Sequence, residues 1–296
     1  MSQETEDLQM LDLFIRASKL QSPQTAKVYY STLKSFLNII NKPTRDVTYD
    51  DLIHYVESLS HLQPATQKRM VTTVRSFFNF LSAQPNYLIY NPMVSFKNPK
   101  VIESDEIEHI MSKEDVEKIR SVLRYKNYRD YVIVSVLIST GLRLTEVTAA
   151  KWCDIQYDTN NNLGLTVVGK GMRKRTIKLS SQIINMIIDY RKKENLNIVI
   201  GDTSDKTPIF INKQGKSLSG RYIEKIVNQS AKIAKLSYNV HPHMFRHYNA
   251  TMALYNGANL HTVQKSLGHK DISTTNRYLY SLHRLDKTTS DYVTLD

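Results

Sequence analysis

One stretch of the chain divides the sequence into two parts. Residues 91–100 (NPMVSFKNPK) are rich in proline, asparagine and lysine, and residues 101–108 (VIESDEIE) hold four acidic residues and no basic one. This composition is typical of an exposed connection and unlike that of a buried helix or strand. We therefore predict two domains, residues 1–97 and 109–296, joined by a linker at residues 98–108. The total length of 296 residues agrees with this division, since a domain usually holds about 100–200 residues.

The first domain is predicted to be helical. Ser22 followed by Pro23, and Thr48 three residues before Asp51, are patterns that begin helices. Apolar residues recur at helical spacing after both patterns, and again in a third segment that begins at Pro64. Charged residues on the other faces of a helix usually do no more than meet water, but three basic ones here are also candidates for contacts with phosphate groups: Lys68, Arg69 and Arg75.

The second domain is predicted to be mainly helical as well. Residues 129–139 (RDYVIVSVLIS) are apolar on nearly every side, as in a helix buried in a core. Gly141 ends this helix, and Thr145 is predicted to cap a short helix that begins at Glu146. The first domain and this one together give a mainly α fold class.

A small β-hairpin is the exception to the helical pattern. Two segments with β-branched residues, 163–169 and 175–179, lie on either side of the sequence KGMRK and predict a pair of strands. Helices are expected again from residue 180 onward. Gly257 and Gly268 lie where C-terminal helix caps are expected.

Positive charge is concentrated in the second half of the chain. The formal net charge is +12 in total, of which residues 1–100 contribute +3 and residues 109–296 contribute +13, while the acidic stretch between them subtracts 4. A basic globular half beside a nearly balanced one favours a polyanionic partner, most often nucleic acid. The alternative, that the charge only aids solubility, stays open at this point.

Composition also excludes several classes of protein. The single cysteine, Cys153, excludes a disulfide framework and a zinc or iron–sulfur site built from several cysteines. The acidic start of the chain is unlike a signal peptide, and no stretch approaches the ~18–20 apolar residues of a membrane span. We expect a soluble cytoplasmic protein with no membrane partner.

The segment HPHMFRH, residues 241–247, is the densest cluster of residues that could carry chemistry. Pro242 can begin a helix, and residues three apart on a helix share a face, so His243 would lie beside Arg246. This pairs a group that can move a proton with one that can hold a phosphate by two hydrogen bonds. A purely structural His–Arg pair is the alternative.

A zinc site at the same segment is disfavoured. His243 and His247 have the spacing of a helical metal-binding pair, but Met244 stands where a metalloprotease has its glutamate. Acidic residues are scarce nearby, so a third ligand would have to come from far along the chain. We predict no metal.

Two further segments carry isolated basic residues. Arg143 lies in the turn after the buried helix, and Glu146 three residues later could hold its guanidinium in place, although an ordinary ion pair at a helix end would look the same. Lys170 stands between two glycines at the tip of the hairpin, where the backbone can approach another molecule closely. Three more basic residues follow in this turn and could enter a DNA groove, unless the turn is simply a solvated loop: Arg173, Lys174 and Arg175.

The last candidate segment is LGHKDISTTNRY, residues 267–278. Asp271 and Ser273 could each begin a short helix carrying Tyr278. Nothing local marks Tyr278 as a nucleophile, and Tyr280 competes with it on spacing alone.

Taken together, TGLRLTE, GKG, HPHMFRH and LGHKDISTTNRY, in this order and at these separations, resemble the catalytic pattern of the tyrosine recombinases, also called the phage integrase family. The match is nearest to the compact Xer-like members. The resemblance covers the whole chain, because the helical first half is similar to the family's SAM-like core-binding domain and even carries Asn91-Pro92 before the linker. It implies a two-domain clamp around DNA, with residues 109–296 as the catalytic domain.

The resemblance also implies a role for each matching residue. These roles are as follows: Tyr278 is the nucleophile, Arg143 and Arg246 clamp the scissile phosphate, His243 is the general base, Lys170 is the general acid for the leaving 5′ oxygen, His269 hydrogen-bonds the phosphate where some members have tryptophan, and Glu146 supports Arg143. His247 is expected to be packed or hydrogen-bonded. Neither a metal nor ATP nor any other cofactor is required.

The implied activity is site-specific recombination of double-stranded DNA through a 3′-phosphotyrosine intermediate. It would proceed in a homotetramer on two sites through a Holliday junction, starting from a free monomer or dimer, and it allows for accessory DNA-bending proteins. The tail from residue 279 to 296 has the length of a segment that docks onto a neighbouring subunit in this family. The biological task would be integration or excision of a mobile element, or resolution of DNA dimers. Two alternatives remain: a DNA-relaxing enzyme like the type IB topoisomerases, and a catalytically silent DNA-binding regulator.

Overall fold

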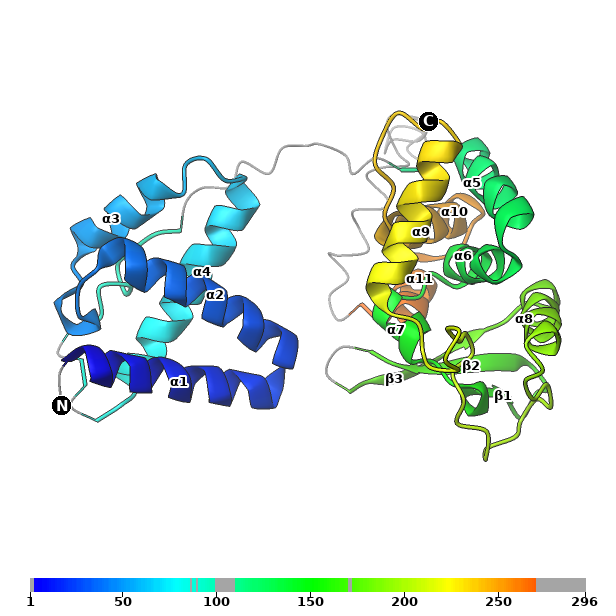
Figure 1. The fold of residues 1–296 in the computed structure, drawn as a ribbon, viewed down its shortest axis with the longest axis horizontal. Coiled ribbons are helices and arrows are strands. Elements are labelled where there is room, and N and C mark those ends of the chain that lie inside the picture. The colour runs from blue at the N-terminus through cyan, green and yellow to red at the C-terminus, as the bar shows by residue number, and fades with distance from the viewer. Residues whose placement is uncertain (1–2, 86, 89, 99–109, 170–171, 270–296) are drawn as a thin grey trace, which may run out of the picture. The chain divides into compact units, whose positions relative to one another are not determined.

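The computed structural model describes residues 3–85, 87–88, 90–98, 110–169 and 172–269. The chain divides into two compact units, residues 1–105 and 106–296 (Figure 1). Each unit has a hydrophobic core of its own. Most of the predicted linker lies outside the described residues. Within the described ranges, no helix combines the length and the apolar character that crossing a membrane requires.

The first unit is helical, as predicted. Its core is rich in aromatic side chains, and the ring of Phe36 meets Tyr55 edge-on at a centroid distance of 4.9 Å. The side chain of Ser22 accepts a hydrogen bond from the backbone N–H of Thr25, and Thr48 and Asp51 form the capping box that their spacing predicts. The helices described in this unit are α1 (Gln3–Gln21), α2 (Pro23–Ile40), α3 (Tyr49–Ser58) and α4 (Pro64–Ser82), with one 3₁₀ turn at Thr44–Asp46.

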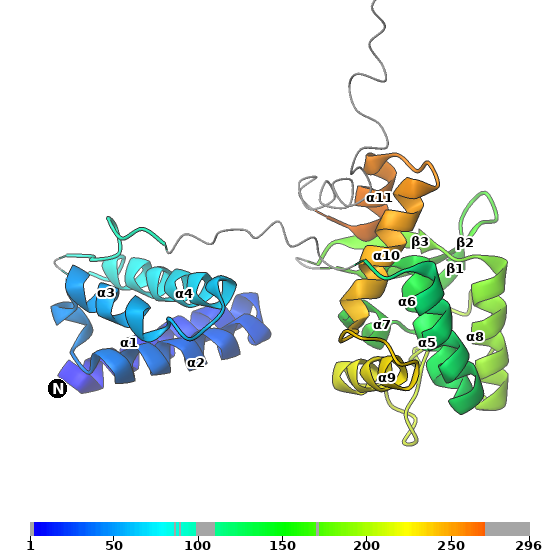
Figure 2. The same ribbon diagram turned by 90° about the horizontal axis from the view of Figure 1, so that it is seen from above.

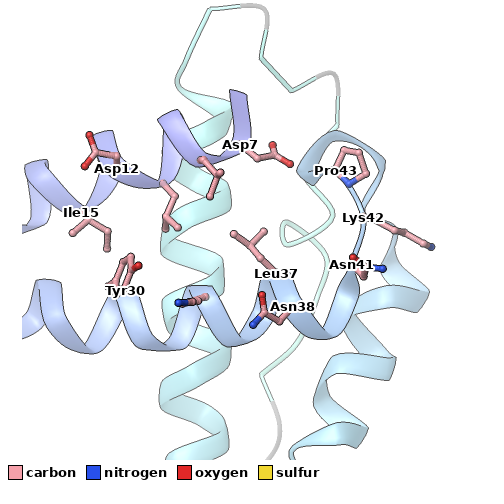
Figure 3. A pocket seen from close by; sticks show the side chains of 12 residues that line it. Asp7, Asp12, Ile15, Tyr30, Leu37, Asn38, Asn41, Lys42 and Pro43 are labelled. Atoms are coloured by element: carbon pink, nitrogen blue, oxygen red, sulfur yellow. The ribbon is translucent and has the colours of Figure 1, made fainter. Parts of the chain in front are cut away.

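A cavity of about 760 Å³ lies between α1 and α2 (Figure 3). Asp7 stands at one end of it, and its carboxylate accepts hydrogen bonds from the backbone N–H and hydroxyl of Thr44 and from the hydroxyl of Tyr87. These bonds connect α1 to the 3₁₀ turn and to the segment that follows α4. Asp7 is therefore a structural group of the first unit.

The second unit is also mainly helical and contains a small antiparallel sheet. Helix α6 lies at its centre and contacts α5, α8, α9 and α10, which explains why its sequence is apolar on nearly every side. The helices described in this unit are α5 (Lys113–Lys126), α6 (Tyr128–Thr140), α7 (Leu144–Ala149), α8 (Ser181–Lys193), α9 (Gly220–Ile233), α10 (Pro242–Tyr255) and α11 (Leu260–Leu267). Figure 2 shows α11 beside the sheet, and this helix contacts the last strand of the sheet.

The sheet has the strand order β1-β2-β3. Strands β2 (Leu163–Val168) and β3 (Lys174–Lys178) form the predicted hairpin, with Val168 opposite Lys174 at its tip. Strand β1 (Ile155–Tyr157) pairs with β2 and was not predicted, because three residues are too few to show a periodic pattern. The mainly α fold class with a small sheet and two domains is confirmed.

The predicted start of the short helix α7 is wrong. Thr145 does not cap it; the helix begins at Leu144, and Arg143 occupies the N-cap position. The carboxylate of Glu146 reaches back to accept a hydrogen bond from the backbone N–H of Arg143 at 2.8 Å. An acidic residue at the third helical position can satisfy this N–H, and here the helix begins two residues earlier than predicted.

Candidate active site

Two arginines from distant parts of the second unit meet at the end of α11. Arg246, on α10, is 1% exposed and donates to the carbonyl of Gly141 at 2.7 Å and to that of Leu267 at 2.6 Å. Arg143 donates to the same Leu267 carbonyl and to that of Gly268, both at 3.4 Å. The two guanidinium groups therefore lie side by side, held by one turn of backbone.

The glycine that ends α6 makes this approach feasible. Gly141 has a φ of +62°, and a Cβ atom there would lie 2.7 Å from Oδ1 of Asn249 and 2.8 Å from a methyl carbon of Leu267. Both the backbone conformation and the space thus require glycine. The turn between α6 and α7 passes directly over α10 and α11, and it carries Arg143 to Arg246.

Glu146 holds Arg143 from the other side. Its side chain is 1% exposed and accepts from Nη1 of Arg143 at 3.0 Å and from both terminal nitrogens of Arg175 at 2.6 and 2.8 Å. Burial alone would raise the pKa of Glu146, but hydrogen bonds from Arg175 and from the backbone of Arg143 outweigh burial and lower it. The carboxylate is ionised, and the two arginines bound to it leave an excess of positive charge.

Three histidines lie at or near the start of α10. His243 is exposed, and its ring meets that of the buried His247 edge-on at a centroid distance of 4.5 Å. The ring of His241 lies 6.5 Å from that of His243. Among the described residues, no group of three or more potential metal ligands is found, so His243 and His247 have no third ligand there. His247 is packed, as expected.

His269 completes the described part of the site. Burial first, and then the positive charges of Arg246, Arg143 and His243, together lower its pKa to about 4. The imidazole is therefore neutral at pH 7 and can donate one ring N–H. The structure thus brings together four of the predicted site residues and their supporting carboxylate: Arg143, Arg246, His243, His269 and Glu146.

Other predicted residues lie outside the described part of the chain. These are the nucleophile Tyr278, the acid Lys170, the helix starts at Asp271 and Ser273, and the docking tail at residues 279–296. Their roles stay predictions. Lys170 follows directly after Gly169, whose backbone N–H donates to the carbonyl of Arg173 across the hairpin tip at 2.8 Å.

The six basic residues predicted to contact DNA fall into two groups. Four have exposed side chains: Lys68, Arg69, Arg173 and Lys174. The other two are engaged within the protein instead. Arg75 donates to the carbonyls of Met93 and Phe96 and to the side chain of Asn98, which fixes the segment after α4. Arg175 binds Glu146.

The inward position of Arg175 is the feature that the sequence analysis missed. Strand β3 alternates, and Arg175 lies on the same face as the buried Ile177, whereas Lys174 and Thr176 are exposed. Successive side chains of a strand point to opposite faces, so the period of two could have separated Arg175 from the exposed basic residues beside it.

Comparison with known proteins gives the family. A model described as Phage integrase family matches residues 101–284, and one described as Phage integrase, N-terminal SAM-like domain, matches residues 10–85. A relative, the tyrosine recombinase XerD of Staphylococcus epidermidis, is 31% identical over 280 residues, which cover 90% of this chain and 91% of the relative.

Solved structures show the same fold. The XerH site-specific recombinase bound to a palindromic difH substrate, a post-cleavage complex, aligns over 95% of this chain and 84% of its own, with a TM-score of 0.77 and 20% identity. A lambda integrase tetramer bound to a Holliday junction aligns over 95% of this chain and 79% of its own, with a TM-score of 0.74 and 17% identity. Because one family model spans more than half of the chain and a relative above 30% identity covers nine tenths of it, the chain belongs to the phage integrase family of tyrosine recombinases, as a Xer-like enzyme of site-specific DNA recombination.

Proposed function

We propose that this recombinase cuts and rejoins duplex DNA through a 3′-phosphotyrosine intermediate formed on Tyr278. The observation that supports the proposal is the meeting of Arg143 and Arg246 at the carbonyl of Leu267, with His269 close by. These residues are far apart in the sequence, and the place where they meet carries more positive than negative charge. A scissile phosphate is the ligand that such a site would stabilise.

The proposed cleavage step forms one bond to phosphorus, breaks another and transfers two protons. The phenolic oxygen of Tyr278 attacks the phosphorus, and the bond from phosphorus to the 5′ oxygen breaks as the new bond forms. His243 takes the phenolic proton, because a tyrosine with an ordinary pKa of about 10 is mostly protonated at neutral pH. Lys170 gives a proton to the 5′ oxygen, since an alkoxide is a poor leaving group. The reverse reaction with another 5′ hydroxyl rejoins the strand without ATP.

The two arginines supply electrostatic stabilisation. A preorganised donor aimed at developing negative charge typically contributes about 3–4 kcal/mol to the transition state. The contacts of Arg143 to backbone carbonyls are long, 3.4 Å each, so phosphate oxygens can replace those carbonyls at little cost. Arg246 is 1% exposed, and its contact with a phosphate therefore requires a rearrangement of the residues that enclose it.

We also propose that recombination takes place in a homotetramer on two DNA sites and passes through a Holliday junction. The solved lambda integrase tetramer on a Holliday junction, which has the same fold, supports this assembly. The biological task is integration or excision of a mobile element, or resolution of DNA dimers.

Replacement of the nucleophile tests the proposal. Tyr278→Phe should bind the recombination site, selected from random duplexes, as tightly as the unmodified protein. On a nicked suicide substrate carrying that site it should form no covalent adduct on a denaturing gel. Tyr280→Phe is the matched control, because it removes a hydroxyl two residues away, and it should form the adduct normally. An adduct that survives Tyr278→Phe and disappears in Tyr280→Phe would overturn the assignment of the nucleophile.

A further inference from the structure

The side chain of Arg175 is held at every nitrogen. Its two terminal nitrogens donate to the two carboxylate oxygens of Glu146 at 2.6 and 2.8 Å, and Nε donates to the carbonyl of Ser266 at 2.8 Å. Only 12% of the side chain is exposed. Arg175 is therefore a component of the protein interior, and its charge is satisfied by protein groups.

Two glycines leave room for this guanidinium. A Cβ atom on Gly268 would lie 3.0 Å from Cδ of Arg175 and 3.2 Å from its Nε, and Gly268 also has a φ of +67°. A Cβ atom on Gly169 would lie 3.4 Å from Nη1 of Arg175 and 3.5 Å from Oε1 of Glu146. Backbone from the hairpin tip and backbone from the end of α11 thus both pack against Arg175.

The segments that meet at Arg175 are those that carry the proposed catalytic residues. Glu146 binds Arg143, and Gly169 directly precedes Lys170. Gly268 directly precedes His269, and the carbonyl of the neighbouring Leu267 binds Arg246. One guanidinium therefore links the hairpin, the start of α7 and the end of α11.

We propose that Arg175 is a positioning residue of the recombination reaction. Through Glu146 it fixes the guanidinium of Arg143, and through Ser266 and Gly268 it fixes the turn that holds Arg246 and His269. The inference rests on the proposed function, since it assigns to Arg175 a part in the same cleavage step. In this role Arg175 makes no direct contact with the phosphate.

The shape of the arginine side chain is essential to this role. A guanidinium meets a carboxylate through two parallel hydrogen bonds and has a third donor that points elsewhere, here to Ser266. An ammonium group is a point charge and cannot keep both partners in one fixed plane. Arg175→Lys should therefore preserve the charge and loosen the geometry. A displacement of about 1 Å in a catalytic group can cost on the order of 10²-fold in rate.

A second buried arginine supplies the matched control. Arg191, on α8, is fully buried and donates to Asp205 at 2.9 Å and to the carbonyls of Asn197 and Pro208. Its hydrogen-bond partners belong to the segment that follows α8, and its guanidinium lies over the ring of Trp152 at 4.3 Å from the centroid. None of these partners belongs to the proposed catalytic segments. Arg191→Lys thus makes the same chemical change at a buried ion pair that has only a structural role.

The experiment compares DNA binding with single-turnover cleavage of the suicide substrate. It is done at a temperature where far-UV circular dichroism shows both lysine variants to be folded. Arg175→Lys should bind the site within about 3-fold of the unmodified protein and cleave it about 10²-fold more slowly. Arg191→Lys should lose about as much thermal stability as Arg175→Lys does, but it should cleave within about 3-fold of the rate of the unmodified protein.

A second pair of variants displaces Arg175 without changing it. Gly268→Ala places a methyl group against Arg175, whereas Gly257→Ala has a similar positive φ, +89°, and no atom within 4 Å of its Cβ. Gly268→Ala should slow cleavage as Arg175→Lys does, and Gly257→Ala should not. If Arg175→Lys and Gly268→Ala cleave as fast as their controls while the adduct still depends on Tyr278, the positioning role is overturned and the proposed function stands. Loss of that dependence on Tyr278 would overturn the proposed function instead.

Discussion

His269 illustrates how the site sets the protonation of a single residue. Burial and the nearby charges of Arg246 and Arg143 lower its pKa from 6.5 to about 4. We predict that an NMR titration of its imidazole has a midpoint near pH 4, so that the ring stays neutral throughout the pH range in which the enzyme meets DNA. The neutral ring adds no positive charge, but it can donate a hydrogen bond to a phosphate oxygen.

The same shift makes stability depend on pH. Between about pH 6.5 and pH 4 the unfolded chain binds a proton at His269 and the folded chain does not, so this group lowers the free energy of unfolding as the pH falls through that window. His269→Gln identifies the resonance by its absence and should remove this part of the pH dependence. A midpoint at pH 6.5 or above would show that the ring is not enclosed by positive charge.

At the scale of elements, the turn between α6 and α7 depends on one glycine. We predict that Gly141→Ala destabilises the second unit by about 2–5 kcal/mol, because it adds about 1–2 kcal/mol of backbone strain and about 1–3 kcal/mol of overpacking. The overpacking is hard to relieve, since Asn249 is held by hydrogen bonds to the carbonyls of Ile138 and Ser139. Urea unfolding followed by Trp152 fluorescence measures this loss in the free energy of unfolding.

Trp152 is a suitable probe because it is the only tryptophan in the sequence and lies in the core of the second unit. Gly257→Ala serves as the control: its φ of +89° carries the same kind of strain, but its Cβ would meet open space. Gly257→Ala should lower the free energy of unfolding by only about 1–2 kcal/mol. Equal losses in the two variants would mean that the turn can move away from Asn249, contrary to the close packing described above.

Most elements could be predicted because their signals are local. Helix starts are indicated by the residue types at Ser22, Thr48 and Pro64. Helix ends are indicated by Gly141 and Gly268, which have the positive φ that glycine allows. Strand β1 could not be predicted, because its three residues are defined only by pairing with β2. The start of α7 was misplaced because two residues, Glu146 and Thr145, could each satisfy the first N–H groups, and sequence alone does not choose between them.

For the molecule as a whole, the candidate site was predictable through resemblance more than through physical pattern. The types and order of Arg143, His243, Arg246 and His269 match the family, yet no local signal indicates that the first and third share the carbonyl of Leu267. Arg175 was grouped with exposed basic neighbours because its partner Glu146 lies 29 residues away. Contacts at such separations are decided by packing, which a linear pattern does not contain.

The charge of the whole chain predicts how it holds DNA. With a net charge of +12, binding to a duplex without a recombination site should weaken steeply with salt, by about 10³–10⁵ between 50 and 200 mM if six to ten phosphates are contacted. If the exposed Lys68 and Arg69 are among the contacts, replacing both by alanine should reduce the slope of log K against log salt by about 2. Fluorescence anisotropy across a salt series measures that slope.

The control for this prediction removes the same charge from another helix of the same unit. Arg16 and Lys19 are exposed on α1, and Arg16 is paired with Asp12 at 2.8 Å. Replacing both by alanine lowers the net charge equally, so it reproduces any effect of overall charge at long range. Because long-range effects are screened beyond about 10 Å at 0.1 M salt, the slope should stay nearly unchanged. Equal reductions in the two double variants would show that α4 makes no direct phosphate contact through Lys68 and Arg69.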